Sequence, residues 1–351
     1  MVVFYNLYKN KRLRMLIVWL EFIFCSAVIV FCGIRLSRYG DIIAEKTGLG
    51  RAWIGLILMA SVTSLPELIT GISSVAIADT PNIALGDIMG SCVFNISIIV
   101  IMDMLHGSAP IFHKSEHGHI LSAGFGIILI SLASISILAN QTIPAIGNIG
   151  LYTPAIILIY GIGIRSVFFF EKRRIAEFVG ETVHATQYEH ISTKEAVNKY
   201  ILNAFFIIAV ATWLPFIGDR LAEETGLGRS FIGTVFIAMT TSLPEVVVSI
   251  SALKIGATDM AIANLFGSNI FNILILAIDD IFYIKGSLLA DVSANHAVTG
   301  FMAVLMTGIA VVSLIYRLER KTFLRLGWDT IAILLAYIVN IYLLYILRVK
   351  G

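Results

Sequence analysis

The sequence predicts an all-α polytopic membrane protein, with ten transmembrane helices in two inverted five-helix repeats. Of its 351 residues, 58% are hydrophobic and 14% are charged, and the mean hydropathy is +0.90. These values lie far outside those of a soluble domain. The apolar stretches run continuously for about 20 residues, as transmembrane helices do, and do not alternate as in a membrane barrel. A long segment also occurs twice, which predicts the repeat.

Ten apolar windows fit the length of a membrane-spanning helix. They are 15–36, 52–78, 82–105, 118–139, 149–170, 200–217, 230–254, 261–284, 293–316 and 327–349. The first window follows a basic run but is longer than the apolar core of a signal peptide, and no small-residue cleavage site follows it. We therefore expect it to remain as a helix. Cys25, Cys32 and Cys92 all fall inside windows, which favours packing roles over disulfides.

The repeat is found by aligning residues 40–67 with 218–245, which gives 17 identities in 28 positions at an offset of 178. The similarity continues between 86–103 and 263–280 at an offset of 177. The repeat unit contains five predicted helices, so the second copy has the opposite orientation in the membrane. Two such halves can open one central site alternately to either side.

The repeat also divides the chain. We expect a first five-helix repeat at 1–170, a cytosolic linker at 171–199 and a second repeat at 200–351. Nine of the 25 Lys and Arg residues fall on the side of the two termini and sixteen on the other side. This bias predicts that the linker lies in the cytoplasm and both termini outside, in a multi-pass protein of the cell membrane.

The motif TSLPE interrupts an apolar helix in each repeat, at 63–67 and at 241–245. A proline inside a helix removes the hydrogen bond to the carbonyl four residues earlier. The carbonyls of Val62 and Thr240 should therefore be free to bind something else. Irregular backbone at this depth is tolerated where it lines a site.

Helical spacing places four groups of residues, most of them polar, each on one face of a predicted helix. These groups are Ala60, Thr63, Ser64 and Glu67; Ala238, Thr241, Ser242 and Glu245; Asp87, Ser91 and Asn95; and Asn264, Ser268 and Asn272. They offer oxygen ligands without Cys or His, which favours hard cations such as Ca²⁺ or Na⁺ over zinc or copper. One Ca²⁺ or two Na⁺ would neutralise the two glutamates, and competition for that charge is a physical basis for exchange. The glycines at 90 and 267 should let the 82–105 and 261–284 helices approach the interrupted helices closely.

At these residues the chain resembles the cation/calcium antiporters, and in particular the sodium/calcium exchanger branch with its two alpha repeats. The resemblance rests on TSLPE followed by GSxxxN in each half, over 40–103 and 218–280. It implies a mid-membrane site in which Glu67 and Glu245 are the principal Ca²⁺ ligands, helped by the carbonyls of Thr63 and Thr241. It further implies sodium sites at Ala60, Ser64 and Ser91 and at Ala238, Ser242 and Ser268, with Asn95 and Asn272 at the centre.

Two positions depart from the family pattern. Some relatives, including potassium-dependent ones, carry Asp where this chain has Asn272, so the resemblance does not imply a potassium requirement. Asp87 replaces the usual Asn of the first repeat. It could be a third ligand, a proton acceptor or a charge at a cytosol-facing entry.

Structural roles compete with the functional ones. Glu67 and Glu245 could be protonated groups that hold helices together, and the hydroxyls could bond back to carbonyls of their own helices. Asp103 and Asp280 are repeated at helix ends, where they could sit at the interface or line a vestibule. The cluster His113, Glu116, His117 and His119 could hold a metal or form a solvated loop.

The expected function is secondary antiport of Na⁺ against Ca²⁺ by alternating access, with the 15–36 and 200–217 helices moving against the other helices. Exchange of Ca²⁺ for H⁺ is the alternative, and a cation channel is a third. No enzyme is expected, since neither H-E-x-x-H nor G-x-S-x-G occurs. We expect no cofactor and no nucleic acid, only the two ions and the bilayer, with a single chain sufficient for transport.

Overall fold

The structure is a computed structural model and describes residues 11–47, 63–107, 109–113, 115–140, 142–178, 191–254, 256–317, 319–322 and 325–347. Nearly all of these residues are helical. The longer helices are α2 (Lys11–Thr47), α5 (Leu65–Ala76), α6 (Pro81–Leu105), α7 (His119–Leu138), α8 (Tyr152–Phe178), α9 (Thr193–Thr225), α12 (Leu243–Lys254), α13 (Thr258–Phe282), α14 (Asn295–Tyr316) and α15 (Trp328–Leu347). The shorter elements are α10 (Arg229–Phe231), the π-helix η2 (Ile232–Ile237), α11 (Ala238–Thr241), the 3₁₀-helix η3 (Leu288–Ala290) and the antiparallel strands β1 (Ala145–Ile146) and β2 (Ile149–Gly150).

The predicted membrane-spanning character is confirmed. Within the described ranges, α2, α6, α7, α8, α9, α13, α14 and α15 are long and apolar enough to cross a membrane. The predicted 230–254 span is a bent pair, Arg229–Thr241 and Leu243–Lys254, whose two parts differ in direction by 42°. The predicted 52–78 span is described only from residue 63 and contains the short apolar helix α5.

Two helices continue past the apolar windows. α8 extends to Phe178, and α9 begins at Thr193 and ends at Thr225, so both enter the polar segment predicted as linker or loop. At the start of α9 the Ser192 side chain accepts a hydrogen bond from the Glu195 backbone N–H at 3.1 Å. At its end Gly226 takes a left-handed φ of 69°. A hydropathy window detects only the apolar part of a helix, so it misses such polar ends.

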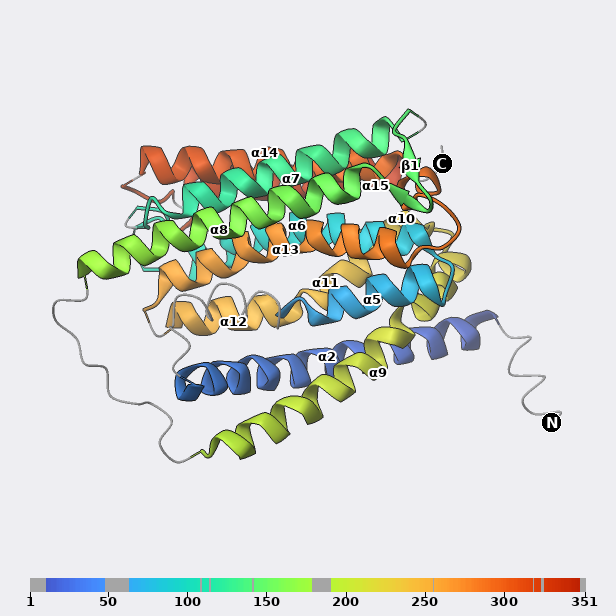
Figure 1. Cartoon of the computed structure of the whole chain (residues 1–351), viewed down its shortest axis with the longest axis horizontal. Coiled ribbons are helices and arrows are strands. Elements are labelled where there is room, and N and C mark those ends of the chain that lie inside the picture. The colour runs from blue at the N-terminus through green and yellow to red at the C-terminus, as the bar shows by residue number, and fades with distance from the viewer. Residues whose placement is uncertain are drawn as a thin grey trace.

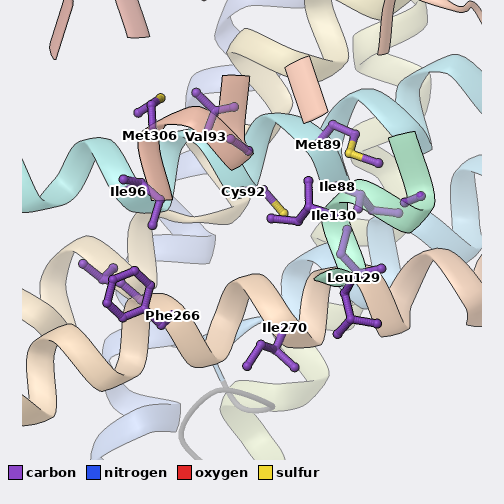
Figure 2. Packing of buried hydrophobic residues seen from close by; sticks show 14 of the residues in the cluster. Ile88, Met89, Cys92, Val93, Ile96, Leu129, Ile130, Phe266, Ile270 and Met306 are labelled. Atoms are coloured by element: carbon purple, nitrogen blue, oxygen red, sulfur yellow. The ribbon is translucent and has the colours of Figure 1, made fainter. Parts of the chain in front are cut away.

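The core lies around α6 and α13, the two most buried spans. Their apolar side chains form one large cluster with residues of α7, α8, α14 and α15. Figure 2 shows part of this cluster, with Cys92 and Ile96 of α6, Leu129 of α7 and Phe266 and Ile270 of α13. The free thiol of Cys92 is buried, so its predicted packing role is confirmed.

α2 and α9 form a separate layer along one face of the molecule (Figure 1). Their contacts belong to two smaller apolar clusters, which include Phe22 and Leu214 in one and Leu36 and Ile207 in the other. Within this two-helix layer Glu21 also pairs with Arg220. The first of these clusters also includes Ile83 of α6 and Ile237 of η2, so the layer packs directly against the rest of the bundle.

The ends of several helices meet on one side of the molecule. Ser293, just before α14, donates its backbone N–H to Asn82 Oδ1 at the start of α6, at 2.7 Å. Asn295 Nδ2 lies 3.4 Å from the Leu347 carbonyl at the end of α15. α2 begins on this side too (Figure 1), and we call it the terminal side.

The opposite side holds the end of α6 and the start of α15, where Thr330 Oγ1 donates to Asp103 Oδ2 at 2.8 Å. α8 ends and α9 begins on this side (Figure 1), and we call it the linker side. α13 begins here, with Asp259 beside His119 of α7, and ends on the terminal side. α6 and α13 therefore run in opposite directions through the core.

Candidate cation site

The interrupted helices break at matching positions in the two halves. Ser64 precedes α5 with φ −88° and ψ 17°, and Ser242 separates α11 from α12 with φ −87° and ψ 7°. Pro66 and Pro244 follow in the first turn of the new helix, where a proline needs no hydrogen-bond partner. The predicted interruption is thus a real break in the second half, and its counterpart in the first half begins in the same backbone conformation.

The two breaks bring the two glutamates together through crossed hydrogen bonds. Ser242 Oγ donates to Glu67 Oε1 at 2.8 Å, and Ser64 Oγ donates to Glu245 Oε1 at 3.0 Å. Each serine therefore supports the carboxylate of the other half of the chain. The four side chains have no exposed surface.

α6 and α13 supply a second pair of hydroxyls. Ser91 Oγ lies 2.9 Å from Ser242 Oγ, and Ser268 Oγ lies 3.4 Å from Glu245 Oε1. Thr63, 1% exposed, also hydrogen bonds to Glu245. These predicted residues are therefore gathered in one cluster, which we call the central cluster.

Asp87 joins this cluster through the second half of the chain. Thr241 Oγ1 lies 2.8 Å from Asp87 Oδ1 and also lies 3.1 Å from the Ile237 carbonyl. Asp87 is fully buried on α6, one turn before Ser91. It therefore lies on the terminal side of Ser91, because α6 begins on that side.

The two predicted central asparagines are buried but differ in their contacts. Asn95 Nδ2 donates to Asn269 Oδ1 at 3.1 Å, and Asn269 Nδ2 donates to the Cys92 carbonyl at 3.0 Å. The side chain of Asn272 has no hydrogen-bond partner among the described residues. The sequence analysis did not identify Asn269 as a site residue. Asn269 stands where the first repeat has Cys92, and a polar residue at a position that differs between the repeats could have indicated it.

Several oxygens in this region are buried without a hydrogen-bond partner within the described chain. They are Glu67 Oε2, Glu245 Oε2, Asp87 Oδ2, Asn95 Oδ1 and Asn272 Oδ1. Leaving an ionised carboxylate unpaired in a protein interior costs several kcal/mol, which a bound cation offsets. All five are carboxylate or amide oxygens, the ligand type that Ca²⁺ and Na⁺ take.

A close helix approach positions this region. A Cβ atom built on Gly90 would lie 2.7 Å from the Ala238 Cβ, and still closer to the Thr234 carbonyl oxygen. The predicted role of this glycine, that of letting α6 approach the interrupted helix, is confirmed. The matching role of Gly267 stays a prediction.

The remaining predicted ligands lie beside the break or outside the described residues. Ala238 begins α11, and its carbonyl accepts the Ser242 backbone N–H at 3.1 Å. Asn264, 6% exposed, lies 3.4 Å from Ser249 Oγ through its Nδ2. Ala60 and Val62 fall outside the described residues, so their predicted roles stay predictions.

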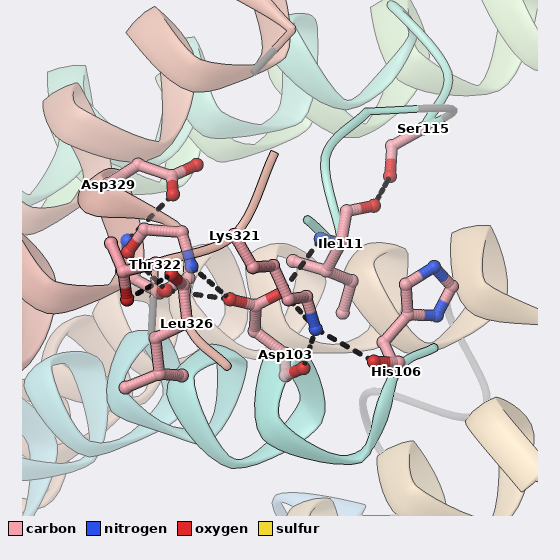
Figure 3. A network of polar contacts seen from close by, with 10 residues as sticks. Asp103, His106, Ile111, Ser115, Lys321, Thr322, Leu326 and Asp329 are labelled. Carbon is pink, nitrogen blue, oxygen red and sulfur yellow. Dashed lines mark hydrogen bonds and ion pairs between the residues drawn. The ribbon is translucent and has the colours of Figure 1, made fainter. Parts of the chain in front are cut away.

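Asp103 and Asp280, considered as vestibule groups, are instead bound by matching donors. Asp103 accepts the backbone N–H groups of Ile111 and Gly327, both at 2.8 Å, and the Thr330 hydroxyl. Lys321 Nζ lies 3.2 Å from its Oδ1 (Figure 3). These contacts tie the end of α6 to the start of α15.

Asp280 repeats the arrangement at the other end of the molecule. It accepts the backbone N–H of Leu288 at 2.7 Å, that of Gly150 at 3.0 Å, and the Thr153 hydroxyl at 2.5 Å. The Tyr152 hydroxyl donates to its other oxygen at 2.5 Å. These contacts tie the end of α13 to the start of α8, so each aspartate joins the two halves.

The histidine-rich loop lies on the linker side, at the start of α7. His119 Nε2 lies 2.9 Å from Asp259 Oδ1, which also accepts the Glu116 backbone N–H at 2.9 Å. Ligand atoms of these three residues lie within 4.8 Å of one another and could hold a metal. The contacts already join α7 to α13, and the group is separate from the central cluster.

A helical membrane bundle with a buried carboxylate pair shared between two repeated halves fits a cation transporter of the antiporter class. Residues 17–168 and 200–346 match the family model described as "Sodium/calcium exchanger protein". The chain belongs to this family, and the resemblance seen in the sequence is confirmed.

Individual relatives agree with this assignment. The chain is 26% identical over 337 residues to the sodium/calcium exchanger MaX1 of Methanosarcina acetivorans, covering 86% of this chain and 91% of the relative. It is 25% identical over 256 residues to the inner membrane protein YrbG of Escherichia coli, covering 71% and 74%.

Solved structures share the fold at low identity. A structure of the sodium-calcium exchanger NCX_Mj, soaked with Na⁺ and Sr²⁺, superposes with a TM-score of 0.61 at 18% identity, over 93% of this chain and 99% of the other. The H⁺/Ca²⁺ exchanger CAX gives a TM-score of 0.70 at 13% identity, over 95% and 86%. Neighbours with both coupling ions share this fold, so the fold alone does not choose between Na⁺ and H⁺.

Proposed function

We propose that the protein exchanges Na⁺ for Ca²⁺ across the membrane by alternating access. The observation that carries the proposal is the crossed pair Ser242–Glu67 and Ser64–Glu245, which joins two buried carboxylates from opposite halves. The two negative charges match one Ca²⁺ or two Na⁺. Binding of either cation set excludes the other, and that competition couples the two fluxes.

In this proposal Glu67 and Glu245 are the Ca²⁺ ligands, helped by the carbonyls of Thr63 and Thr241. The sodium sites are those that the family resemblance implies: Ala60, Ser64 and Ser91, and Ala238, Ser242 and Ser268, with Asn95 and Asn272 between them. No cofactor takes part, and a single chain in the cell membrane is sufficient. The free carboxylate and amide oxygens of the central cluster support this ligand set.

The proposed architecture is ten spans in two inverted repeats, 1–170 and 200–351, joined by a cytosolic linker at 171–199. The opposite directions of α6 and α13 and the matched breaks at Ser64 and Ser242 support it. The moving unit is the layer of α2 and α9, which lies along one face of the molecule, outside the core around α6 and α13 (Figure 1). Sliding of this layer would open the enclosed site to one side at a time.

Exchange of Ca²⁺ for H⁺ is the second candidate, and Asp87 favours it. This additional buried carboxylate has one oxygen without a partner in the described chain, and it could carry a proton. A channel is disfavoured because the site residues named above are enclosed, with at most 6% of any side chain exposed among the described ones.

The test is ⁴⁵Ca²⁺ uptake into liposomes that contain the purified protein. Na⁺-loaded vesicles are diluted into Na⁺-free buffer, beside K⁺-loaded vesicles and vesicles with a pH gradient. Glu67→Gln and Glu245→Gln should abolish uptake, whereas Glu223→Gln, at the exposed end of α9, should leave it unchanged. Uptake that needs internal Na⁺ supports the proposal, and uptake driven by the pH gradient alone supports proton coupling. Uptake that persists in both glutamine variants contradicts the site assignment.

A further inference from the structure

Asp279 on α13 is a buried carboxylate that the site described above does not use. It has no exposed surface, and neither of its oxygens has a hydrogen-bond partner in the described part of the chain. Its neighbour Asp280 is also buried but accepts hydrogen bonds on both oxygens. Asp279 is therefore not part of the contacts that hold the end of α13.

The carboxylate of Asp279 lies against α5. A Cβ atom built on Gly71 would lie 2.7 Å from Asp279 Oδ1 and still closer to Oδ2. Gly71 follows Glu67 by four residues, which is about 6 Å along a helix. Asp279 also follows Asn272 by seven residues, so the two share a face of α13. Asp279 therefore lies on the terminal side of the central cluster, between α13 and α5.

Asp87 lies on the same side of the central cluster. It stands one turn before Ser91 on α6, which begins at the terminal side, and its Oδ2 has no partner in the described chain. α6 and α13, which carry Asp87 and Asp279, are the two most buried spans and pack in the same core. Two carboxylates with free oxygens thus stand between the glutamate pair and the terminal side.

The other half of the molecule lacks this feature. The repeat offset of 177 pairs Asp87 with Asn264 and Asp279 with Met102. Both counterparts are uncharged, and Asn264 Nδ2 is engaged with Ser249 Oγ at 3.4 Å. Of these two pairs of matching positions, the pair on the terminal side carries carboxylates and the other does not.

We propose that Asp87 and Asp279 form a second cation subsite on the terminal side of the Glu67–Glu245 pair, and that it takes a divalent hard cation, here Ca²⁺. Two carboxylates balance one divalent ion, and their oxygens are the ligand type that Ca²⁺ prefers. The proposal rests on the proposed function, because the subsite holds the ion as it enters or leaves the central cluster. In the predicted orientation this side is outside the cell, so a cytosol-facing role for Asp87 would require the opposite orientation.

The test counts bound ions by equilibrium dialysis of the purified protein with ⁴⁵Ca²⁺, and measures Ca²⁺ half-saturation of transport at each membrane face. The variants are Asp279→Asn and Asp279→Met, the latter being the residue of the matching position in the other half. The double variant Glu67→Gln/Glu245→Gln removes the central pair. Elution as a single folded species in size-exclusion chromatography checks each variant.

The wild type should bind one Ca²⁺ more than either Asp279 variant, and the double glutamine variant should keep one ion while losing transport. The Asp279 variants should still transport, with a half-saturation raised about tenfold at the terminal face only, the size expected for one lost charged contact. Equal ion counts in the wild type and the Asp279 variants would overturn the subsite while leaving the proposed function intact. Loss of all Ca²⁺ binding in the double glutamine variant would overturn it too. A wild type that binds no Ca²⁺ would overturn both proposals.

Discussion

Ser242 and Glu67 lie in different halves of the chain, yet the Ser242 hydroxyl donates to Glu67 Oε1 at 2.8 Å. The reciprocal contact, from Ser64 to Glu245 Oε1, measures 3.0 Å. The site is thus assembled across the two repeats, and neither half holds its own glutamate alone.

The two crossed serines, Ser64 and Ser242, should differ in how much they contribute to the apparent Ca²⁺ affinity. Glu245 Oε1 keeps a second donor, Ser268 at 3.4 Å, when Ser64 is replaced, whereas the Ser242 hydroxyl contacts both Glu67 and Ser91. We expect Ser242→Ala to weaken apparent Ca²⁺ affinity roughly 10- to 100-fold, since a hydrogen bond to a charged group contributes about 1.5–3 kcal/mol. Ser64→Ala should have a smaller effect. Titration of ⁴⁵Ca²⁺ uptake measures both, and an equal or reversed order would show that these hydroxyls do not support the carboxylates as described.

The close approach at Gly90 predicts a steric effect. Gly90→Ala places a methyl group 2.7 Å from the Ala238 Cβ, and overpacking of this kind costs typically about 1–3 kcal/mol. We expect less folded protein and slower transport, measured by fluorescence-detected size-exclusion chromatography and by uptake. Gly124→Ala is the matched control, because no heavy atom lies within 4 Å of a Cβ built there on α7. Normal yield and activity of Gly90→Ala would contradict tight packing at this crossing.

Much of this fold and site could be predicted because the causes are local. Helical spacing placed Ser91, Ser268 and the two glutamates on polar faces of four helices, and the prolines marked where the helices break. That these faces meet in one site was implied by the family resemblance, and the structure brings them together. The π-helix Ile232–Ile237 was not predicted, since no proline or glycine pair in the sequence indicates it; in the structure its Gly233 packs closely against Gly86 of α6.

The missed contacts depend on partners distant in the sequence. The donors to Asp103 come from a loop after α6 and from the start of α15. The spacing of residues around Asp103 in the sequence therefore does not indicate them. Asn269 and Asp279 were missed for another reason. Both stand where the other repeat has an uncharged or less polar residue. Comparing the repeats for identical residues does not select positions at which they differ.

The contacts of Asp103 predict a strong effect on stability. Asp103→Asn leaves Lys321, whose side chain is 6% exposed, as an uncompensated buried charge. Breaking one partner of a buried ion pair costs about 3–5 kcal/mol, so the thermal stability in detergent should fall sharply. Asp103→Asn/Lys321→Met should recover part of the loss, because the unpaired charge is gone. If the double variant is no more stable than the single one, the ion pair is not the source of the effect.

The proposed movement of the α2 and α9 layer can be tested by a cross-link to the rest of the bundle. Ser26 Oγ on α2 lies 3.1 Å from Thr240 Oγ1 on α11, so Ser26→Cys/Thr240→Cys should form a disulfide between the layer and the rest of the bundle. The background replaces the native cysteines at 25, 32 and 92 by alanine. Oxidation should stop ⁴⁵Ca²⁺ uptake, and a reductant should restore it. The single variants Ser26→Cys and Thr240→Cys are the matched controls, because neither can form this disulfide and both should leave uptake sensitive to neither treatment. Full uptake by the oxidised Ser26/Thr240 variant, with cross-linking verified by mass spectrometry, would mean that α2 keeps its position relative to α11 throughout the transport cycle.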